Sequence, residues 1–157
     1  MQSIELRGFK ELDEALGKIL DQLPEMRREF HEELAEIIKN EVDAAIVSSG
    51  VSDSNEKVRK WQVKHVGSGG GYAAVRAAGG KEGAEIGPNG PGAITNYLEN
   101  GHKIRNPSGR SKRYRPRIRV ARVPGHYFYE TEYARIEGLM LKKAEEWLNQ
   151  IAKELEG

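Results

Sequence analysis

The chain has 157 residues, a length that suits one domain of the usual size of about 100–150 residues. Its 25 basic and 24 acidic residues nearly cancel, which excludes a uniformly cationic nucleic-acid coat. The absence of cysteine excludes disulfides and thiolate metal sites. No apolar run approaches the roughly 18 residues of a membrane span, and the first residues lack the apolar core of a signal peptide. We therefore expect a soluble protein made in a reducing compartment.

The near-zero net charge hides an uneven distribution along the chain. Residues 1–60 carry a net charge of −5 and residues 130–157 a net charge of −3, whereas residues 100–129 hold nine basic and no acidic groups. Hydrophobic residues make up only 38% of the chain. We expect a thin core that a partner surface helps to bury.

Both ends of the chain are predicted to be helical. Apolar residues recur every three or four positions from Phe9 to Leu23, again from Met26 to Ile46, and in the C-terminal part of the chain. Pro24 separates the first two stripes and predicts a break between two helices. Charges of both signs fill the polar faces, which argues against a membrane-surface or calmodulin-binding helix.

The middle of the chain predicts strands and loops. Residues 61–66 and 72–76 are β-prone runs joined by a glycine-rich link, which predicts a hairpin. A short helix is expected over residues 91–100, with Gly101 just past its end. Arginines alternate with other residues over 117–123, as in a strand with one arginine face.

These elements predict an α+β fold in which long N-terminal helices and a C-terminal helix pack on a small antiparallel β-sheet that carries a long glycine-rich hairpin and a basic loop. We expect a single domain over residues 1–157. Its N-terminal helices cover residues 1–47. The sheet, hairpin, short helix and basic loop cover residues 58–123, and the C-terminal helix covers residues 129–155.

The hairpin tip is a candidate docking element. It does not match the dinucleotide-binding fingerprint, because Tyr72 stands where the third glycine belongs. A flexible tip with several glycines followed by one aromatic residue can become ordered against a partner. The residues concerned are Gly67, Ser68, Gly69, Gly70, Gly71 and Tyr72.

Catalytic patterns are incomplete. The run from His31 begins a zinc-binding helix motif, but Ala35 occupies the position of the second histidine. The four histidines lack metal-ligand spacing, and no phosphate-binding Gly-Lys-Ser/Thr loop is present. We expect no enzymatic activity, no cofactor and no metal. A nuclease would need Glu99, Glu130 or a histidine near the arginines.

The basic segment is the strongest functional signal. We define it as residues 103–122, with Lys103, Arg105, Arg110, Lys112, Arg113, Tyr114, Arg115, Arg117, Arg119 and Arg122 as candidate contacts to a partner or to DNA. Three interpretations stay open. The segment is a solvated loop and edge strand, it binds an acidic protein surface such as the helices of a neighbouring copy, or it contacts nucleic acid.

The order of four short motifs resembles the head–tail junction, or tail-completion, family of tailed bacteriophages, a group often described as minor tail components. The motifs are the opening Ile4–Leu12, the long helix ending near Ala45, the stretch Tyr97–His102, and Val123–Phe128 before the last helix. The matching signature residues are Leu98, Glu99, Gly101, His102, Pro124 and Phe128. Residues 48–54 depart from the Pro-x-x-Thr-Gly-x-Leu motif that many members carry there.

The resemblance implies a non-enzymatic virion or prophage protein of the neck or tail, assembled in the bacterial host cytoplasm. Such a homo-oligomer, commonly a hexamer ring, joins the head connector or adaptor to the tail tube or tail terminator during tail completion. DNA in the channel is a possible further contact, and a membrane is not. The alternative function is a nucleic-acid-binding module that uses the basic segment.

Overall fold

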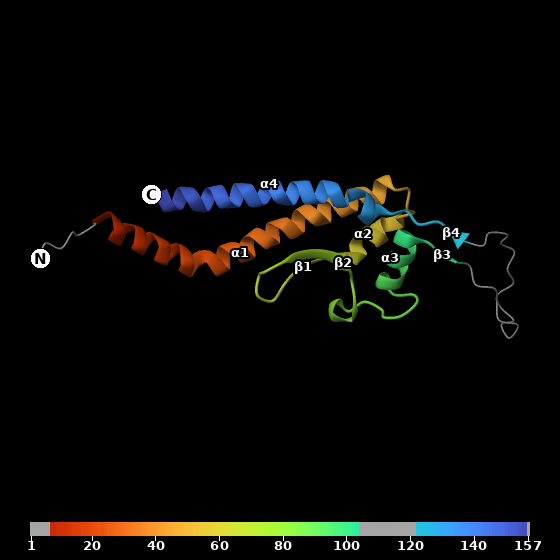
Figure 1. Ribbon diagram of the computed structural model, residues 1–157. Helices are drawn as coiled ribbons and strands as arrows, with labels where there is room; N and C mark the ends of the chain where they lie inside the picture. The colour runs from red at the N-terminus through yellow and green to blue at the C-terminus, as the bar shows by residue number, and fades with distance from the viewer. Residues whose placement is uncertain (1–6, 104–121, 157) are drawn as a thin grey trace, which may run out of the picture. The chain divides into compact units, whose positions relative to one another are not determined.

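The computed structural model describes residues 7–103 and 122–156, without the side chains of residues 7–13 and 15 (Figure 1). Helix α1 (Arg7–Ser48) is followed by a 3₁₀ turn (Ser54–Glu56) and the short helix α2 (Lys57–Trp61). Strands β1 (Gln62–Val66) and β2 (Ala73–Ala77), a second 3₁₀ turn (Gly80–Glu82) and helix α3 (Pro91–Asn100) come next. Strands β3 (His102–Lys103) and β4 (Arg122–Val123) precede helix α4 (Phe128–Glu156). The fold is α+β, as predicted.

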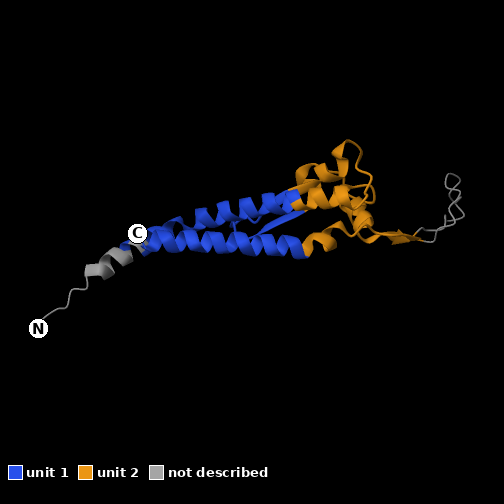
Figure 2. Ribbon diagram, turned by 90° about the horizontal axis from the view of Figure 1, so that it is seen from above, with its two compact units in different colours: residues 1–40, 64–75, 134–157 blue, residues 41–63, 76–133 orange. Residues whose placement is uncertain are grey.

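The chain forms two compact units (Figure 2). Unit 1 comprises residues 1–40, 64–75 and 134–157, and unit 2 comprises residues 41–63 and 76–133. Among the described residues, no helix is long and apolar enough to cross a membrane.

The predicted helix break at Pro24 is wrong, because α1 runs through this position as one helix of 42 residues. Proline removes one helical hydrogen bond and crowds the preceding turn. Pro24 lies on an exposed side of α1, where water can satisfy the freed carbonyl. The apolar stripe keeps its phase across the proline, with Ile19 and Leu34 both buried. Packing of this stripe therefore outweighs the local preference of one residue.

Unit 1 is built on an antiparallel pairing of α1 with α4. The rings of Phe30 and Trp147 stack with their centroids 4.9 Å apart, and Lys143 Nζ lies 2.5 Å from a carboxylate oxygen of Glu33. A higher residue number in α1 thus faces a lower number in α4, which defines the antiparallel direction. The β1–β2 hairpin joins α1 through an ion pair between Lys64 and Glu36.

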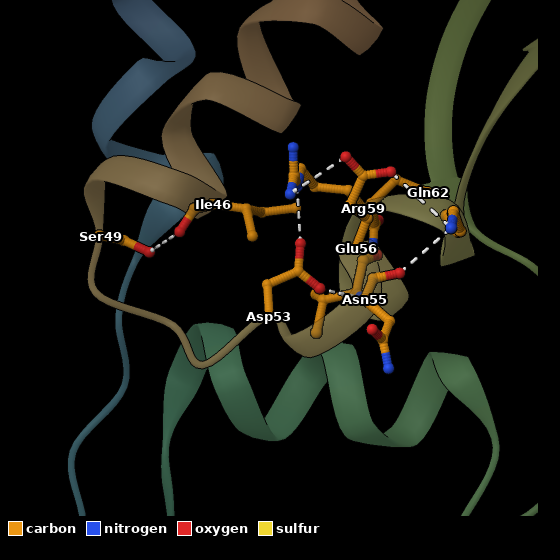
Figure 3. A network of polar contacts seen from close by, with 9 residues as sticks. Ile46, Ser49, Asp53, Asn55, Glu56, Arg59 and Gln62 are labelled. Atoms are coloured by element: carbon orange, nitrogen blue, oxygen red, sulfur yellow. Dashed lines mark hydrogen bonds and ion pairs between the residues drawn. The ribbon is translucent and has the colours of Figure 1, made fainter.

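Unit 2 has its own small core. Its buried apolar side chains are those of Val42, Ala45, Ile46, Val51, Val58, Ala78 and Phe128. Asp53 fixes the turn that leads into α2, because its carboxylate accepts hydrogen bonds from the Val58 backbone N–H at 2.6 Å and from Arg59 Nε at 2.7 Å (Figure 3). Burial raises the pKa of Asp53, but the hydrogen bonds from Arg59 and Val58 together with the positive charge of Arg59 lower it by more, so that the pKa lies below its ordinary value.

The strands form two separate two-stranded sheets rather than the one small sheet expected. Strands β1 and β2 pair through the predicted hairpin, and β3 pairs antiparallel with β4. The end of the predicted arginine strand is present in β4, and residues 117–121 lie outside the described residues. Helix α3 covers the predicted range 91–100, with Gly101 following it at a φ of 72°.

Candidate functional site

The ends of the basic segment meet in a narrow ribbon. Lys103 of β3 pairs directly with Arg122 of β4, and both are exposed. Arg122 Nη2 also reaches the carbonyl oxygen of Asn100 at 3.4 Å. The other candidate contacts, Arg105, Arg110, Lys112, Arg113, Tyr114, Arg115, Arg117 and Arg119, lie outside the described residues. The ribbon is exposed, and its pairing brings the two ends of this segment together at the surface of unit 2.

Two glycines allow the base of this ribbon to close. A Cβ atom on Gly101 would lie 2.3 Å from the carbonyl oxygen of Val123 and 2.7 Å from the nitrogen of Gly125. A Cβ atom on Gly125 would lie 2.1 Å from the carbonyl oxygen of Glu99. The positive φ of Gly101 is a second reason for glycine there. Only a glycine fits this backbone contact, which brings the end of α3 against the entry to α4.

Glu99 caps helix α4 from a distant part of the chain. Its side chain is buried, and its carboxylate accepts hydrogen bonds from the backbone N–H groups of Tyr129 at 3.0 Å and Glu130 at 3.1 Å. The carbonyl oxygen of Glu99 accepts a further bond from the N–H of Tyr127 at 3.1 Å. A negative charge at a helix N-terminus is favoured by the helix dipole. The buried carboxylate therefore has a structural role.

From the sequence, Glu99 was expected only as a signature residue and as a residue that a nuclease would need, not as a helix cap. A signal was available, because Tyr127 precedes α4 where Ser, Thr, Asp or Asn would ordinarily cap a helix. An unfilled cap position predicts an acceptor from elsewhere in the chain.

The signature residues gather around this cap in unit 2. Leu98 accepts a backbone hydrogen bond from His126 at 2.7 Å, and Phe128 is only 1% exposed. His102 lies beside Tyr97, with ring centroids 5.2 Å apart, while Pro124 is exposed next to the Gly101 contact. The geometry explains their spacing in structural terms, because they join α3 to α4.

A buried polar network lies next to the cap. Gln62 is 1% exposed, and its amide nitrogen donates to the carbonyl of Val58 at 3.2 Å and to Thr95 Oγ1 at 3.1 Å. The Tyr129 hydroxyl donates to the amide oxygen of Gln62. Burial, together with the negative charges of Glu99 and Asp43, raises the pKa of Tyr129 to about 12. Tyr129 thus stays a neutral donor, which suits a structural hydrogen bond.

The hairpin tip lies against α1 within unit 1. Arg27 Nη2 donates to the carbonyl oxygen of Gly69 at 2.9 Å, and Arg28 Nη2 donates to that of Ser68 at 3.2 Å. Across the hairpin, Gly67 and Tyr72 share a backbone hydrogen bond of 3.0 Å. Two arginines of α1 therefore hold the tip of the candidate docking element against this helix.

An aromatic groove lies between α1 and α4 in unit 1. Its volume is about 370 Å³, and the stacked rings of Phe30 and Trp147 line it together with Met26. Polar lining comes from both helices, namely Gln22, Glu29, Glu33, Lys143, Glu146, Gln150 and Glu154. Four glutamates against one lysine give the groove a negative potential. We refer to it below as the acidic groove.

The one lysine of the acidic groove is already paired. Its ion pair with Glu33, with a further contribution from Glu146, raises the pKa of Lys143 above its ordinary value. The groove was not predicted from the sequence, because its carboxylates lie on two helices more than 100 residues apart and converge only when α1 and α4 pair.

The histidines have structural surroundings. His31 Nδ1 lies 2.8 Å from the carbonyl oxygen of Arg27, and His126 Nδ1 lies 3.0 Å from that of Ser49. His65 lies 3.0 Å from the Tyr72 hydroxyl. Within residues 7–103 and 122–156, no group of three or more metal-ligating side chains comes together.

No protein-family model matches the chain, and no curated protein or solved structure matches it either.

Proposed function

We propose that this protein is a structural subunit of the neck or tail of a tailed bacteriophage or prophage. In this role it forms an oligomeric ring that joins the head connector to the tail tube during tail completion. The observation that carries the proposal is the separation of charge along the chain. The acidic groove lies in unit 1, whereas the ribbon of unit 2 holds the ends of a segment that has nine basic and no acidic residues.

Separated charges of opposite sign favour head-to-tail contacts between copies. Such contacts join two different surfaces of the same chain, and they close into a ring when the rotation between copies allows it. Electrostatic complementarity also selects the correct register and speeds association. One kind of subunit therefore carries both halves of the interface.

Exposed apolar side chains give further support. Leu20 and Leu141 are each 66% exposed, and Leu148 is 59% exposed, all on the helices of unit 1. Leu141 and Leu148 are seven residues apart and thus lie on one side of α4. Leucine side chains exposed in this way are available for burial against another subunit.

The order of the four motifs, which resembles that of the head–tail junction family, is consistent with this role. The signature residues form the joint between α3 and α4, and the same joint holds the base of the basic segment. The proposal thus assigns the signature a structural function, which is to present residues 103–122 from a rigid base.

The experiment is a mass measurement of the full chain across concentration. Native mass spectrometry, light scattering and negative-stain electron microscopy should show a ring of identical copies that forms as concentration rises. The variant Arg113→Glu with Arg115→Glu should lose the ring while retaining its helix content by circular dichroism. A chain that stays monomeric at all concentrations would contradict the proposal.

A second candidate is a nucleic-acid-binding module, favoured by the exposure of Lys103 and Arg122 at the ends of the basic segment. This function predicts a monomer or dimer with DNA affinity that falls steeply with salt, by about 0.9 log units per log salt for each phosphate neutralised. Measuring both the mass and the DNA affinity of the same chain distinguishes the two functions.

A further inference from the structure

The acidic groove has the chemistry of a receptor for arginine or lysine side chains. Three of its carboxylates, those of Glu29, Glu146 and Glu154, remain in addition to the Glu33 that holds Lys143. The face of an aromatic ring attracts a guanidinium, which binds there by stacking and by cation–π attraction. Trp147 and Phe30 offer such rings inside the groove. A lining that combines aromatic rings with carboxylates favours a cationic guest over an anionic one.

The chain itself contains a segment with the complementary chemistry. Residues 103–122 carry nine basic side chains and no acidic ones, and arginines recur at every second position from Arg113 to Arg119. If the segment binds in an extended conformation, arginines at every second position would all face the same side. The ribbon of β3 and β4 fixes both ends of this segment at the surface of unit 2.

We propose that the acidic groove of one copy binds the basic segment, residues 103–122, of a second copy. The inference rests on the oligomer of the proposed function and names the two surfaces that form its interface. An interface that joins a groove to a different surface on the neighbour is heterologous, as a closed ring requires. Because its charged groups lie at a partly exposed groove, the contact weakens as salt screens them.

A peptide-binding experiment tests the groove without reference to the oligomer. The full chain is prepared with Arg113→Gln, Arg115→Gln, Arg117→Gln and Arg119→Gln, so that its own segment no longer competes. Trp61→Phe leaves Trp147 as the single tryptophan reporter, since the chain contains two. A synthetic peptide of residues 103–122 should change the Trp147 fluorescence and saturate. A peptide with all its lysines and arginines replaced by glutamine should not.

Two variants matched in charge show whether the guest lies in the groove. The groove variant carries Glu29→Gln, Glu146→Gln and Glu154→Gln and should bind the peptide about tenfold or more weakly. The control variant carries Glu32→Gln, Glu137→Gln and Glu145→Gln, three exposed residues of the same helices that do not line the groove. The control should bind within about twofold of the parent. Equal weakening in both variants would overturn the groove assignment, because only net charge would then matter.

A mixing experiment shows whether the guest comes from a second copy. A chain with the groove variant keeps an intact basic segment, and a chain with the four arginine substitutions keeps an intact groove. Each alone should be monomeric, whereas the mixture should form a dimer that cannot grow, with twice the 17.6 kDa subunit mass. A mixture that stays monomeric would overturn the second-copy assignment.

The outcomes separate this inference from the proposed function. Rings that persist in the groove variant would overturn the interface described here and leave the ring itself standing. A wild-type chain that stays monomeric while its groove binds the peptide would overturn the ring and the second-copy assignment together. If the groove variant loses its rings while the matched control keeps them, the result supports both the ring and the groove interface.

Discussion

The carboxylate of Glu99 caps helix α4 by accepting a hydrogen bond from the backbone N–H of Tyr129, 30 residues away in sequence, with 3.0 Å between Oε2 and the nitrogen. This bond joins the end of α3 to the start of α4 beside the two strands that hold the basic segment. The joint therefore has a defined geometry at the base of the basic segment.

Replacing this carboxylate by an amide should destabilise unit 2. Glu99→Gln keeps one acceptor oxygen but loses the second hydrogen bond and the favourable charge at the helix N-terminus, a cost of about 1–2 kcal/mol. Urea unfolding followed by circular dichroism measures the change. Glu85→Gln removes an exposed carboxylate in the same unit and serves as the control, with an expected change under about 0.5 kcal/mol. A stability of Glu99→Gln equal to that of the control would contradict the capping role.

A methyl group at Gly101 should open the base of the ribbon. Gly101→Ala combines a φ of 72° with a contact of 2.3 Å to the Val123 carbonyl, so we expect a loss of about 2 kcal/mol or more. Gly92→Ala is the matched control in the exposed part of α3, where no atom lies within 4 Å of the added carbon. That control should gain about 0.5–1 kcal/mol from helix propensity. Thermal unfolding of both variants checks the opposite signs.

The phenol of Tyr129 should lose its proton only at high pH, and the stability of the folded chain should therefore fall in the alkaline range. Its pKa is raised from 10.0 to about 12, so the folded state holds the phenol proton more tightly than the unfolded state does. The resulting stability is complete below pH 10 and is lost as pH rises toward 12, a total of about 2–3 kcal/mol. Ultraviolet absorbance of tyrosinate should show one late step that Tyr129→Phe removes. A wild-type chain without that step would show that Tyr129 is open to solvent.

Local pattern was sufficient to predict where α1, α3 and α4 lie in the chain, but not that α1 is one continuous helix, nor the short helix α2, nor the contacts between elements. The apolar stripes of α1 and α4 and the glycine after α3 are properties of neighbouring residues, and the structure has them where they were expected. The predicted break at Pro24 was wrong because the helix-breaking preference of one residue is small compared with the packing of an apolar stripe that stays in phase over a long helix. Glu99 and the acidic groove depend on residues 30 and more than 100 positions apart, which periodicity does not connect.

The hairpin tip should loosen when its two arginine anchors are removed. Arg27→Ala with Arg28→Ala deletes the hydrogen bonds to Gly69 and Ser68, which are exposed, so global stability should fall by less than about 1 kcal/mol. Hydrogen exchange of the amides of Gly67 and Gly70 should accelerate by about fivefold to tenfold, because local opening no longer breaks those bonds. Lys18→Ala, an exposed change elsewhere on α1, should leave the exchange unchanged. Unaltered exchange in the double variant would mean that the turn holds its shape without the arginines.

Removing the proline from α1 should strengthen the helix. Pro24→Ala restores a backbone donor and relieves the crowding of the preceding turn, and the exposed ring gives up little packing, so we expect a gain of up to about 3 kcal/mol. Urea unfolding and far-ultraviolet circular dichroism measure the gain, with Glu25→Ala as the neighbouring control. A loss of stability would show that the shape of α1 at Pro24 is needed for the pairing that stacks Phe30 on Trp147. In that case, Pro24→Ala should also weaken peptide binding to the acidic groove, which the Trp147 fluorescence assay detects directly.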